Sequence, residues 1–157
     1  LIEKEKKKLK TSVPIVVKIS PDIEDENINK ISDLLIKYKV KAVIISNTTD
    51  KNRHNLSNIN KLEKGGLSGK PLEKKSDELI NKFYKILKNE VKIIGVGGVD
   101  SGQSAYQKII NGASLVQLYT GMIYQGPNIV SKINEELINI LDKEGVQNIS
   151  DIVGSKK

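Results

Sequence analysis

Four short apolar runs alternate with four longer amphipathic runs along this chain, and no other feature restricts its possible folds as strongly. Apolar runs of four to six residues separated by helix-like segments are typical of parallel strands in an α/β domain. We expect strands at residues 15–19, 42–46, 92–96 and 115–118. We expect helices at residues 24–37, 72–87, 101–112 and 128–144, followed by a short helix at 149–153.

The third strand runs into a glycine turn, and the fourth ends on two hydroxyl residues. Gly97 and Gly98 lie between an apolar strand and the start of a helix, where backbone N–H groups and the helix N-terminus favour an anion. Tyr119 and Thr120 follow the fourth strand and can add N–H and hydroxyl donors. Adjacent loops of this kind form the phosphate site after strands seven and eight of many (β/α)8 barrels.

Two architectures fit four βα units, a small doubly wound sheet and part of a (β/α)8 TIM barrel. Polar and glycine residues gather after every strand, which places them at one common edge, and the first unit lacks a GxGxxG pattern. The pattern favours the barrel. We expect residues 1–157 to form the C-terminal half of a single barrel domain, with about four βα units. The chain starts at Leu1, which fits a fragment whose N-terminal half is absent.

Composition narrows the functional classes. The 157 residues include no cysteine, which excludes disulfides, a thiolate nucleophile and a cysteine-ligated metal; we expect no metal site. The net charge is +7, but the lysines are scattered over the predicted helices, so we expect no nucleic-acid partner. A basic module that binds nucleic acid remains an alternative, although 4% aromatic residues provide few platforms for base stacking.

Individual side chains near the strand ends suggest a ring-binding site. Lys18 either faces a barrel interior, where its charge would stabilise an anionic reduced flavin, or extends past the strand end into water. The segment Ser46-Asn47-Thr48-Thr49 can read the edge of a planar ring or form an ordinary turn. These residue patterns leave both pairs of alternatives open.

Five segments in this order resemble dihydroorotate dehydrogenase, and more closely its class 2, membrane-associated, quinone-dependent form. They are VVKISPD from Val16, IISNTT from Ile44, GGLSGKPL from Gly65, IIGVGGVDSG from Ile93 and GASLVQLYTGMIYQGP from Gly112. The resemblance implies an enzyme that uses FMN to oxidise (S)-dihydroorotate to orotate in pyrimidine biosynthesis and passes the electrons to a quinone.

The same resemblance assigns roles to ten residues. It implies that Asn47 and Thr48 bind the substrate, and that the cofactor is bound by Lys18, Ser46, Ser68, Gly69, Gly97, Gly98, Tyr119 and Thr120. It places the catalytic base, and the region that receives the quinone, in the missing N-terminal half, so no catalytic residue is expected here. The implied location is the mitochondrial inner membrane in a eukaryote or the cytoplasmic membrane in a bacterium.

Three other interpretations stay open. One is a soluble class 1 dihydroorotate dehydrogenase, another is a related pyrimidine flavoprotein, and the third is a non-flavin barrel that binds a sugar phosphate. His54 is expected at the surface, and Asp22 is expected to shape a turn or cap the following helix. We also expect a half-barrel to be stable only with its missing half or in an assembly that covers its open edges.

Overall fold

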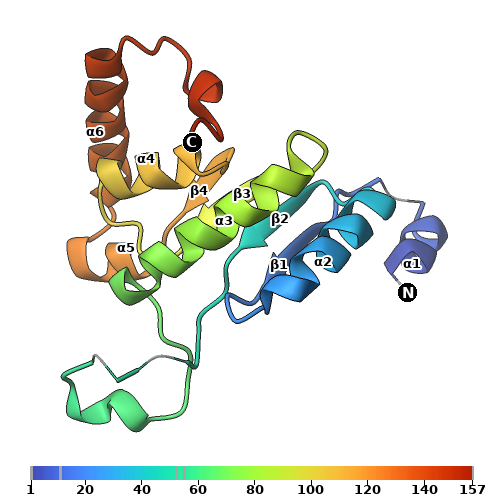
Figure 1. The fold of residues 1–157 in the computed structure, drawn as a ribbon, viewed down its shortest axis with the longest axis horizontal. Coiled ribbons are helices and arrows are strands. Elements are labelled where there is room, and N and C mark those ends of the chain that lie inside the picture. Colours follow the sequence, from blue (N-terminus) through green and yellow to red (C-terminus); the bar gives the residue numbers. More distant parts are fainter. Residues whose placement is uncertain (1, 11, 52, 55, 157) are drawn as a thin grey trace.

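The sheet at the centre of the molecule has four parallel strands in sequential order, as Figure 1 shows. The computed structural model describes residues 2–10, 12–51, 53–54 and 56–156. The strands are β1 (Val16–Ile19), β2 (Ala42–Ile45), β3 (Lys92–Val96) and β4 (Leu115–Gln117). Each begins and ends within one residue of the prediction, because each is an apolar run bounded by polar or glycine residues.

Helices connect the strands and extend the chain beyond them. They are α1 (Ile2–Lys8), α2 (Asp25–Lys37), α3 (Glu73–Leu87), α4 (Gly102–Ile110), α5 (Thr120–Gln125) and α6 (Ile129–Glu144). Three short 3₁₀ helices are η1 (Ile59–Leu62), η2 (Lys70–Leu72) and η3 (Ile149–Ile152). The sequence predicted α2, α3, α4, α6 and the short terminal helix, whereas α5 was missed. Within the described residues, no helix has the length and apolar character needed to cross a membrane.

One face of the sheet carries the main core. Val43, Ile45 and Ile93 point toward α2 and α3 and are buried, and Phe83 of α3 is completely buried between them. Apolar residues recur on α2 and α3 at helical spacing, so each helix presents one apolar stripe to the strands. A second cluster joins α4 to α6 through Ala105, Ile109 and Ile133.

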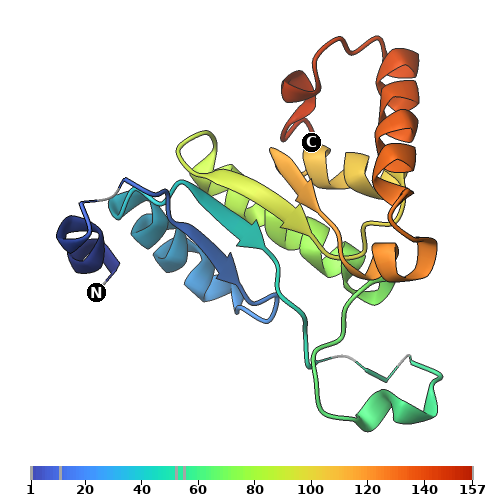
Figure 2. The same cartoon turned by 180° about the vertical axis from the view of Figure 1, so that it is seen from behind.

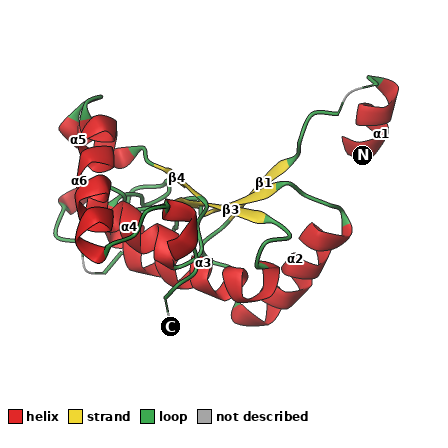
Figure 3. Cartoon of the chain, turned by 90° about the horizontal axis from the view of Figure 1, so that it is seen from above, coloured by secondary structure: helices red, strands yellow, loops and turns green. Residues whose placement is uncertain are grey.

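No helix among the described residues packs on the opposite face of the sheet. Figure 3 shows α2, α3 and α4 on one side of the strands only. Val16 on β1 is 44% exposed and Leu115 on β4 is 62% exposed, although both lie within the sheet. An open face of this kind is what a half-barrel leaves when the strands that would close the barrel are not part of the chain. A doubly wound sheet carries helices on both faces, so the one-sided layer and the sequential strand order identify half of a (β/α)8 barrel.

A long polar loop follows β2 and stands away from the body of the molecule, as Figure 2 shows. Its two ends are joined by an antiparallel bridge, in which Thr49 and Leu67 exchange backbone hydrogen bonds of 3.1 and 2.6 Å. Inside the loop, the Arg53 guanidinium donates to the backbone carbonyl oxygens of Lys61, Glu63 and Gly65. We call residues 50–66 the β2–α3 loop. It connects β2 to the segment that leads into α3.

Candidate functional site

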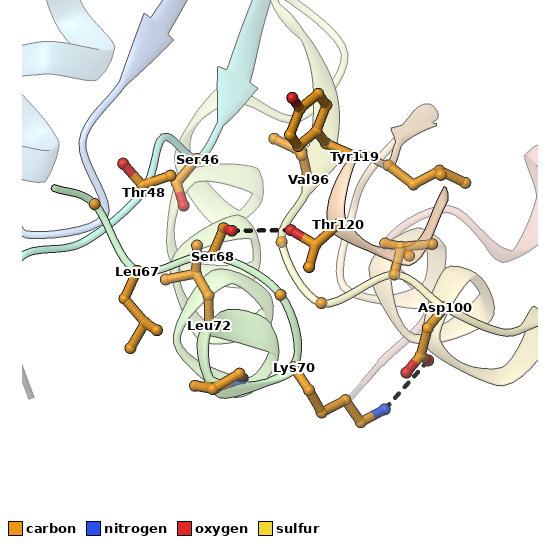
Figure 4. Close-up of a pocket in the computed structure, with 18 of the residues that line it drawn as sticks. Ser46, Thr48, Leu67, Ser68, Lys70, Leu72, Val96, Asp100, Tyr119 and Thr120 are labelled. Carbon is orange, nitrogen blue, oxygen red and sulfur yellow. Dashed lines mark hydrogen bonds and ion pairs between the residues drawn. The ribbon is translucent and has the colours of Figure 1, made fainter. Parts of the chain in front are cut away.

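A cavity of about 750 Å³ lies at the edge of the sheet where the strands end, and the loops after β2, β3 and β4 form most of its wall (Figure 4). This is the edge at which (β/α)8 barrels carry their sites. All ten residues to which the resemblance assigned a role line this one cavity. They are Lys18, Ser46, Asn47, Thr48, Ser68, Gly69, Gly97, Gly98, Tyr119 and Thr120. Their individual roles stay predictions.

Lys18 lies on the uncovered face of the sheet. Its neighbours Val17 and Ile19 pack against the core, and strand alternation turns Lys18 the other way. In this chain alone the side chain is exposed, because nothing described here covers that face. Lys18 therefore lies on the face that would form the barrel interior and lines the cavity, while its role toward a flavin stays a prediction.

The segment after β2 is held at its backbone. The N–H of Ser46 donates to Val96 at 3.1 Å, and the N–H of Asn47 donates to the carbonyl of Ile19 at 2.8 Å. Ser46 is buried, whereas Asn47 and Thr48 are exposed. Neighbouring strands thus hold the backbone of this segment while two of its side chains remain available to a ligand.

The glycine turn after β3 and the segment after β4 supply backbone donors. The N–H groups of Gly98, Tyr119 and Thr120 have no hydrogen-bond partner among the described residues, and all three residues line the cavity. Gly98 has a φ of 75°, and a Cβ there would come within 2.4 Å of Glu73 Cβ, so only glycine fits the turn. Unpartnered N–H groups on neighbouring residues of a cavity wall are suited to an anion such as a phosphate.

The N-terminus of α4 was expected to contribute to the same anion site, and several of its N–H groups are bonded within the protein. Ser101 and Ser104 form a capping box, in which each side chain accepts from the other residue's N–H. The N–H of Gly102 donates to the Glu136 carboxylate at 2.5 Å. The N–H groups of Ser101, Gly102 and Ser104 are thus occupied within the protein, whereas the glycine turn and the β4 segment offer unpartnered donors.

A side-chain contact joins the two glycine-rich walls of the cavity. The hydroxyl groups of Ser68 and Thr120 lie 2.9 Å apart and share a hydrogen bond (Figure 4). Gly69 has a φ of 79°, and a Cβ there would lie 2.9 Å from Thr120 Cγ2. The chain before α3 therefore packs directly on the start of α5, and a side chain at residue 69 would push the two apart.

Lys70 and Asp100 also line the cavity, and neither was singled out from the sequence. The Lys70 ammonium lies 2.6 Å from the Glu73 carboxylate and 3.4 Å from that of Asp100. The hydrogen bond to Glu73 raises the pKa of Lys70, and Asp100 adds to that effect. Both residues belong to the glycine motifs quoted above, which is the signal that could have identified them.

Asp22 connects three elements instead of capping α2. Its carboxylate accepts from the Thr49 hydroxyl at 2.7 and 2.9 Å and forms an ion pair with Lys75 of α3. Burial alone would raise the pKa of Asp22, but the hydrogen bonds from Lys75 and Thr49 outweigh it and hold the pKa below its ordinary value. The side chain at the N-cap position of α2, Glu24, makes no capping bond.

The side chains of the cavity provide hydrogen-bond donors and the ammonium groups of Lys18 and Lys70, but no set of metal ligands among the described residues. Among the described residues there is no group of three histidine, aspartate or glutamate side chains that could hold a metal ion. His54, the sole histidine, lies exposed in the β2–α3 loop, as predicted. The donors fit a phosphorylated planar cofactor such as FMN: unpartnered N–H groups for its phosphate, and Lys18 with Ser46 toward a ring.

A family model for dihydroorotate dehydrogenase matches residues 1–141. The chain belongs to the dihydroorotate dehydrogenase family. A dihydroorotate dehydrogenase (quinone) from Trichodesmium erythraeum is 44% identical over 97% of this chain and 41% of its own length. One from Buchnera aphidicola is 49% identical over 80% of this chain and 37% of its own length. Among the first relatives, the chain spans 35–41% of their length.

Solved structures agree with this dihydroorotate dehydrogenase fold. A DHODH from Eimeria tenella in complex with ferulenol superimposes with a TM-score of 0.87 and 39% identity, over 90% of this chain and 38% of that one. The ligand-free form of the same enzyme gives a TM-score of 0.86 over 89% of this chain. The four βα units therefore correspond to a part of a dihydroorotate dehydrogenase, in agreement with the half-barrel seen here.

Proposed function

We propose that this chain is the C-terminal half of an FMN-dependent dihydroorotate dehydrogenase and works with an N-terminal half that completes the barrel. The observation that carries this proposal is the single cavity lined by all ten expected residues, with unpartnered N–H donors in its wall. The relatives named dihydroorotate dehydrogenase (quinone) support the substrate, which is dihydroorotate, and the product, which is orotate.

The residues of this chain would divide the work as follows. The N–H groups of Gly98, Tyr119 and Thr120 bind the phosphate of FMN and hold the cofactor in place. When bound, FMN supplies a hydride acceptor for C6 of dihydroorotate. Lys18 places a positive charge beside the flavin ring and so stabilises negative charge there. Asn47 hydrogen-bonds the pyrimidine edge, which orients C6 toward the flavin.

The proton at C5 of dihydroorotate needs a base from outside this chain. Among the described residues, the one carboxylate in the cavity wall is Asp100, and it is paired with Lys70. We therefore assign the base to the N-terminal half, together with the rest of the substrate contacts.

We further propose that electrons leave to a quinone at a membrane surface. The names of the relatives support this acceptor. In a bacterium the membrane would be the cytoplasmic membrane, and in a eukaryote the inner mitochondrial membrane.

The visible spectrum of the completed barrel tests the main proposal. We expect an oxidised flavin band that bleaches anaerobically when dihydroorotate is added and returns when a soluble quinone analogue is added. A coloured protein that dihydroorotate does not bleach would overturn the substrate assignment. A colourless protein would favour the non-flavin phosphate barrel, and reoxidation by soluble acceptors without quinone would favour a class 1 enzyme.

A further inference from the structure

The segment that carries Asn47 and Thr48 is fixed at both ends by different groups. Upstream, the N–H of Asn47 is held by the carbonyl of Ile19 in β1. Downstream, the Thr49 hydroxyl donates to the Asp22 carboxylate, and Thr49 is only 4% exposed. Thr48 itself makes no hydrogen bond to other described residues. The position of its side chain therefore depends on its neighbours.

Thr49 also closes the β2–α3 loop, and this brings the far end of the loop against Thr48. The bridge between Thr49 and Leu67 places Gly66 beside Thr48, so closely that a Cβ on Gly66 would lie 1.9 Å from Thr48 Oγ1. The Thr49 hydroxyl oxygen in turn accepts from the N–H of Lys51 at 3.1 Å. One buried threonine thus organises the backbone on both sides of the predicted substrate contacts.

The position of Asp22 is itself fixed by contacts to two other residues. Its N–H donates to Ser20 Oγ at 3.1 Å, and its carboxylate is paired with Lys75, whose side chain is 33% exposed while that of Asp22 is 13% exposed. Asp22 comes from the β1–α2 turn and Lys75 from α3, so Thr49 is tied to two further elements of the barrel. Hydrogen bonds to a charged, shielded group are stronger than neutral ones.

We propose that Asp22 and Thr49 are positioning residues for the dihydroorotate site: through the Thr49 hydroxyl they fix the orientation of Asn47 and Thr48 toward the pyrimidine ring. The proposal rests on the function proposed above. Neither residue lines the cavity, so neither touches the substrate. A displacement of about 1 Å in a positioning group can cost on the order of a hundredfold in rate, so a small relaxation of this segment is expected to be measurable.

The deciding variants are Thr49→Val, which removes the hydroxyl and keeps the shape, and Thr49→Ser, which keeps the hydroxyl. In the FMN-loaded, completed barrel, we expect Thr49→Val to weaken orotate binding about tenfold or more, read from the change orotate causes in the flavin spectrum. Thr49→Ser should restore most of the affinity. Asp22→Asn should fall between the two, because its amide keeps one acceptor but loses the charge opposite Lys75.

A matched control is available in the same pair of helices. Lys82 of α3 and Asp25 of α2 form an exposed ion pair at 2.6 Å, and neither residue lines the cavity or bonds to Thr49. Asp25→Asn removes an ion pair of the same kind and should leave orotate affinity and the KM for dihydroorotate unchanged. Flavin content should be the same in all variants, since none of these residues contacts the cofactor site.

Two results would overturn the proposal. One is orotate affinity in Thr49→Val equal to that of the wild type. The other is an equal loss in Thr49→Val and Thr49→Ser, which would assign the effect to packing. Both are distinct from failure of the proposed function, in which the wild-type flavin itself would not be reduced by dihydroorotate.

Discussion

The proposed chemistry depends on the positive charge of Lys18. Because its side chain is exposed in this chain, a substitution can remove the charge without disturbing the core. We expect Lys18→Met in the completed barrel to slow flavin reduction on the order of a hundredfold, as removal of one stabilising group near developing charge does elsewhere. Orotate affinity should change much less. Stopped-flow absorbance at saturating dihydroorotate measures the first quantity, and a spectral titration measures the second.

A lysine outside the site provides the control for that experiment. Lys74 lies on the outer face of α3 with 91% of its side chain exposed. Lys74→Met changes the net charge by the same amount and should leave both quantities unaltered. Flavin reduction at the wild-type rate in Lys18→Met would remove Lys18 from the mechanism.

At the same scale, the sequence predicted the residues of the cavity better than the contacts that support them. Asn47 and Gly98 stand in motifs of local spacing, so their place at a strand end can be read from neighbouring letters. The bond between Asp22 and Thr49 joins residues 27 positions apart, and Lys75 is 53 positions from Asp22. Nothing in the local pattern around Asp22 distinguishes such a long-range anchor from an ordinary turn residue.

Helices α3 and α4 are joined by a buried ion pair. The Lys108 ammonium is completely shielded and lies 2.5 Å from the Asp77 carboxylate, and it also donates to the Glu73 carbonyl at 3.3 Å. Burial lowers the pKa of Lys108 and raises that of Asp77, while the attraction between them opposes both shifts. The position of α4 against α3, and of the glycine turn between β3 and α4, depends on this pair.

Removing one member of the Lys108–Asp77 pair should lower the free energy of unfolding more than replacing both members with apolar residues. A single Asp77→Leu substitution leaves an uncompensated buried ammonium, which typically destabilises by about 3–5 kcal/mol. Adding Lys108→Met to it should recover most of that loss, because two apolar side chains can pack where the pair was. Thermal unfolding of the wild type, Asp77→Leu and the double variant ranks their stabilities. A double variant that is less stable than Asp77→Leu would contradict this account.

Elements with a clear apolar period were predicted correctly, and those without one were not. Strand β3 and helix α3 match their expected bounds because Ile93 and Phe83 belong to regular apolar patterns. Helix α5 has six residues, TGMIYQ, of which none is buried. A helix that buries nothing within its own chain gives no amphipathic signal.

At the scale of the whole molecule, one face and two edges of the sheet are open among the described residues. The sheet face that carries Val16 and Leu115 is open, and β1 and β4 each leave one edge unpaired among the described residues. Open strand edges and apolar faces promote association. We expect this chain alone to self-associate or bind a hydrophobic dye, and to become monodisperse when the complementary half-barrel is co-expressed. Sedimentation velocity measures both states, and a monomer that unfolds cooperatively alone would contradict the expectation.

At this scale the half-barrel and its open interior face could both be predicted, because four of eight strands cannot cover the inward side of their own sheet. The apolar character of residues such as Val16 and Leu115 is what a strand buried on both faces requires, and a sequence carries no mark of which chain supplies the second cover. Apolar residues on both faces of β1 and β4 thus fit the completed barrel. Only in the isolated half are some of them exposed to water.

The bridge between Thr49 and Leu67 separates the β2–α3 loop from the barrel in a way that matters for evolution and engineering. Because the two ends of the loop are already joined, adding or deleting residues between them changes only the cost of closing a loop, which grows slowly with its length. The strand register and the spacing of the cavity wall stay the same. Insertions, tags or a new chain break should therefore be tolerated at little cost at the tip of the loop, in residues 56–60, away from Lys51 and Gly66, which contact Thr49 and Thr48. A single inserted residue between Asn47 and Thr49 would instead shift the whole site.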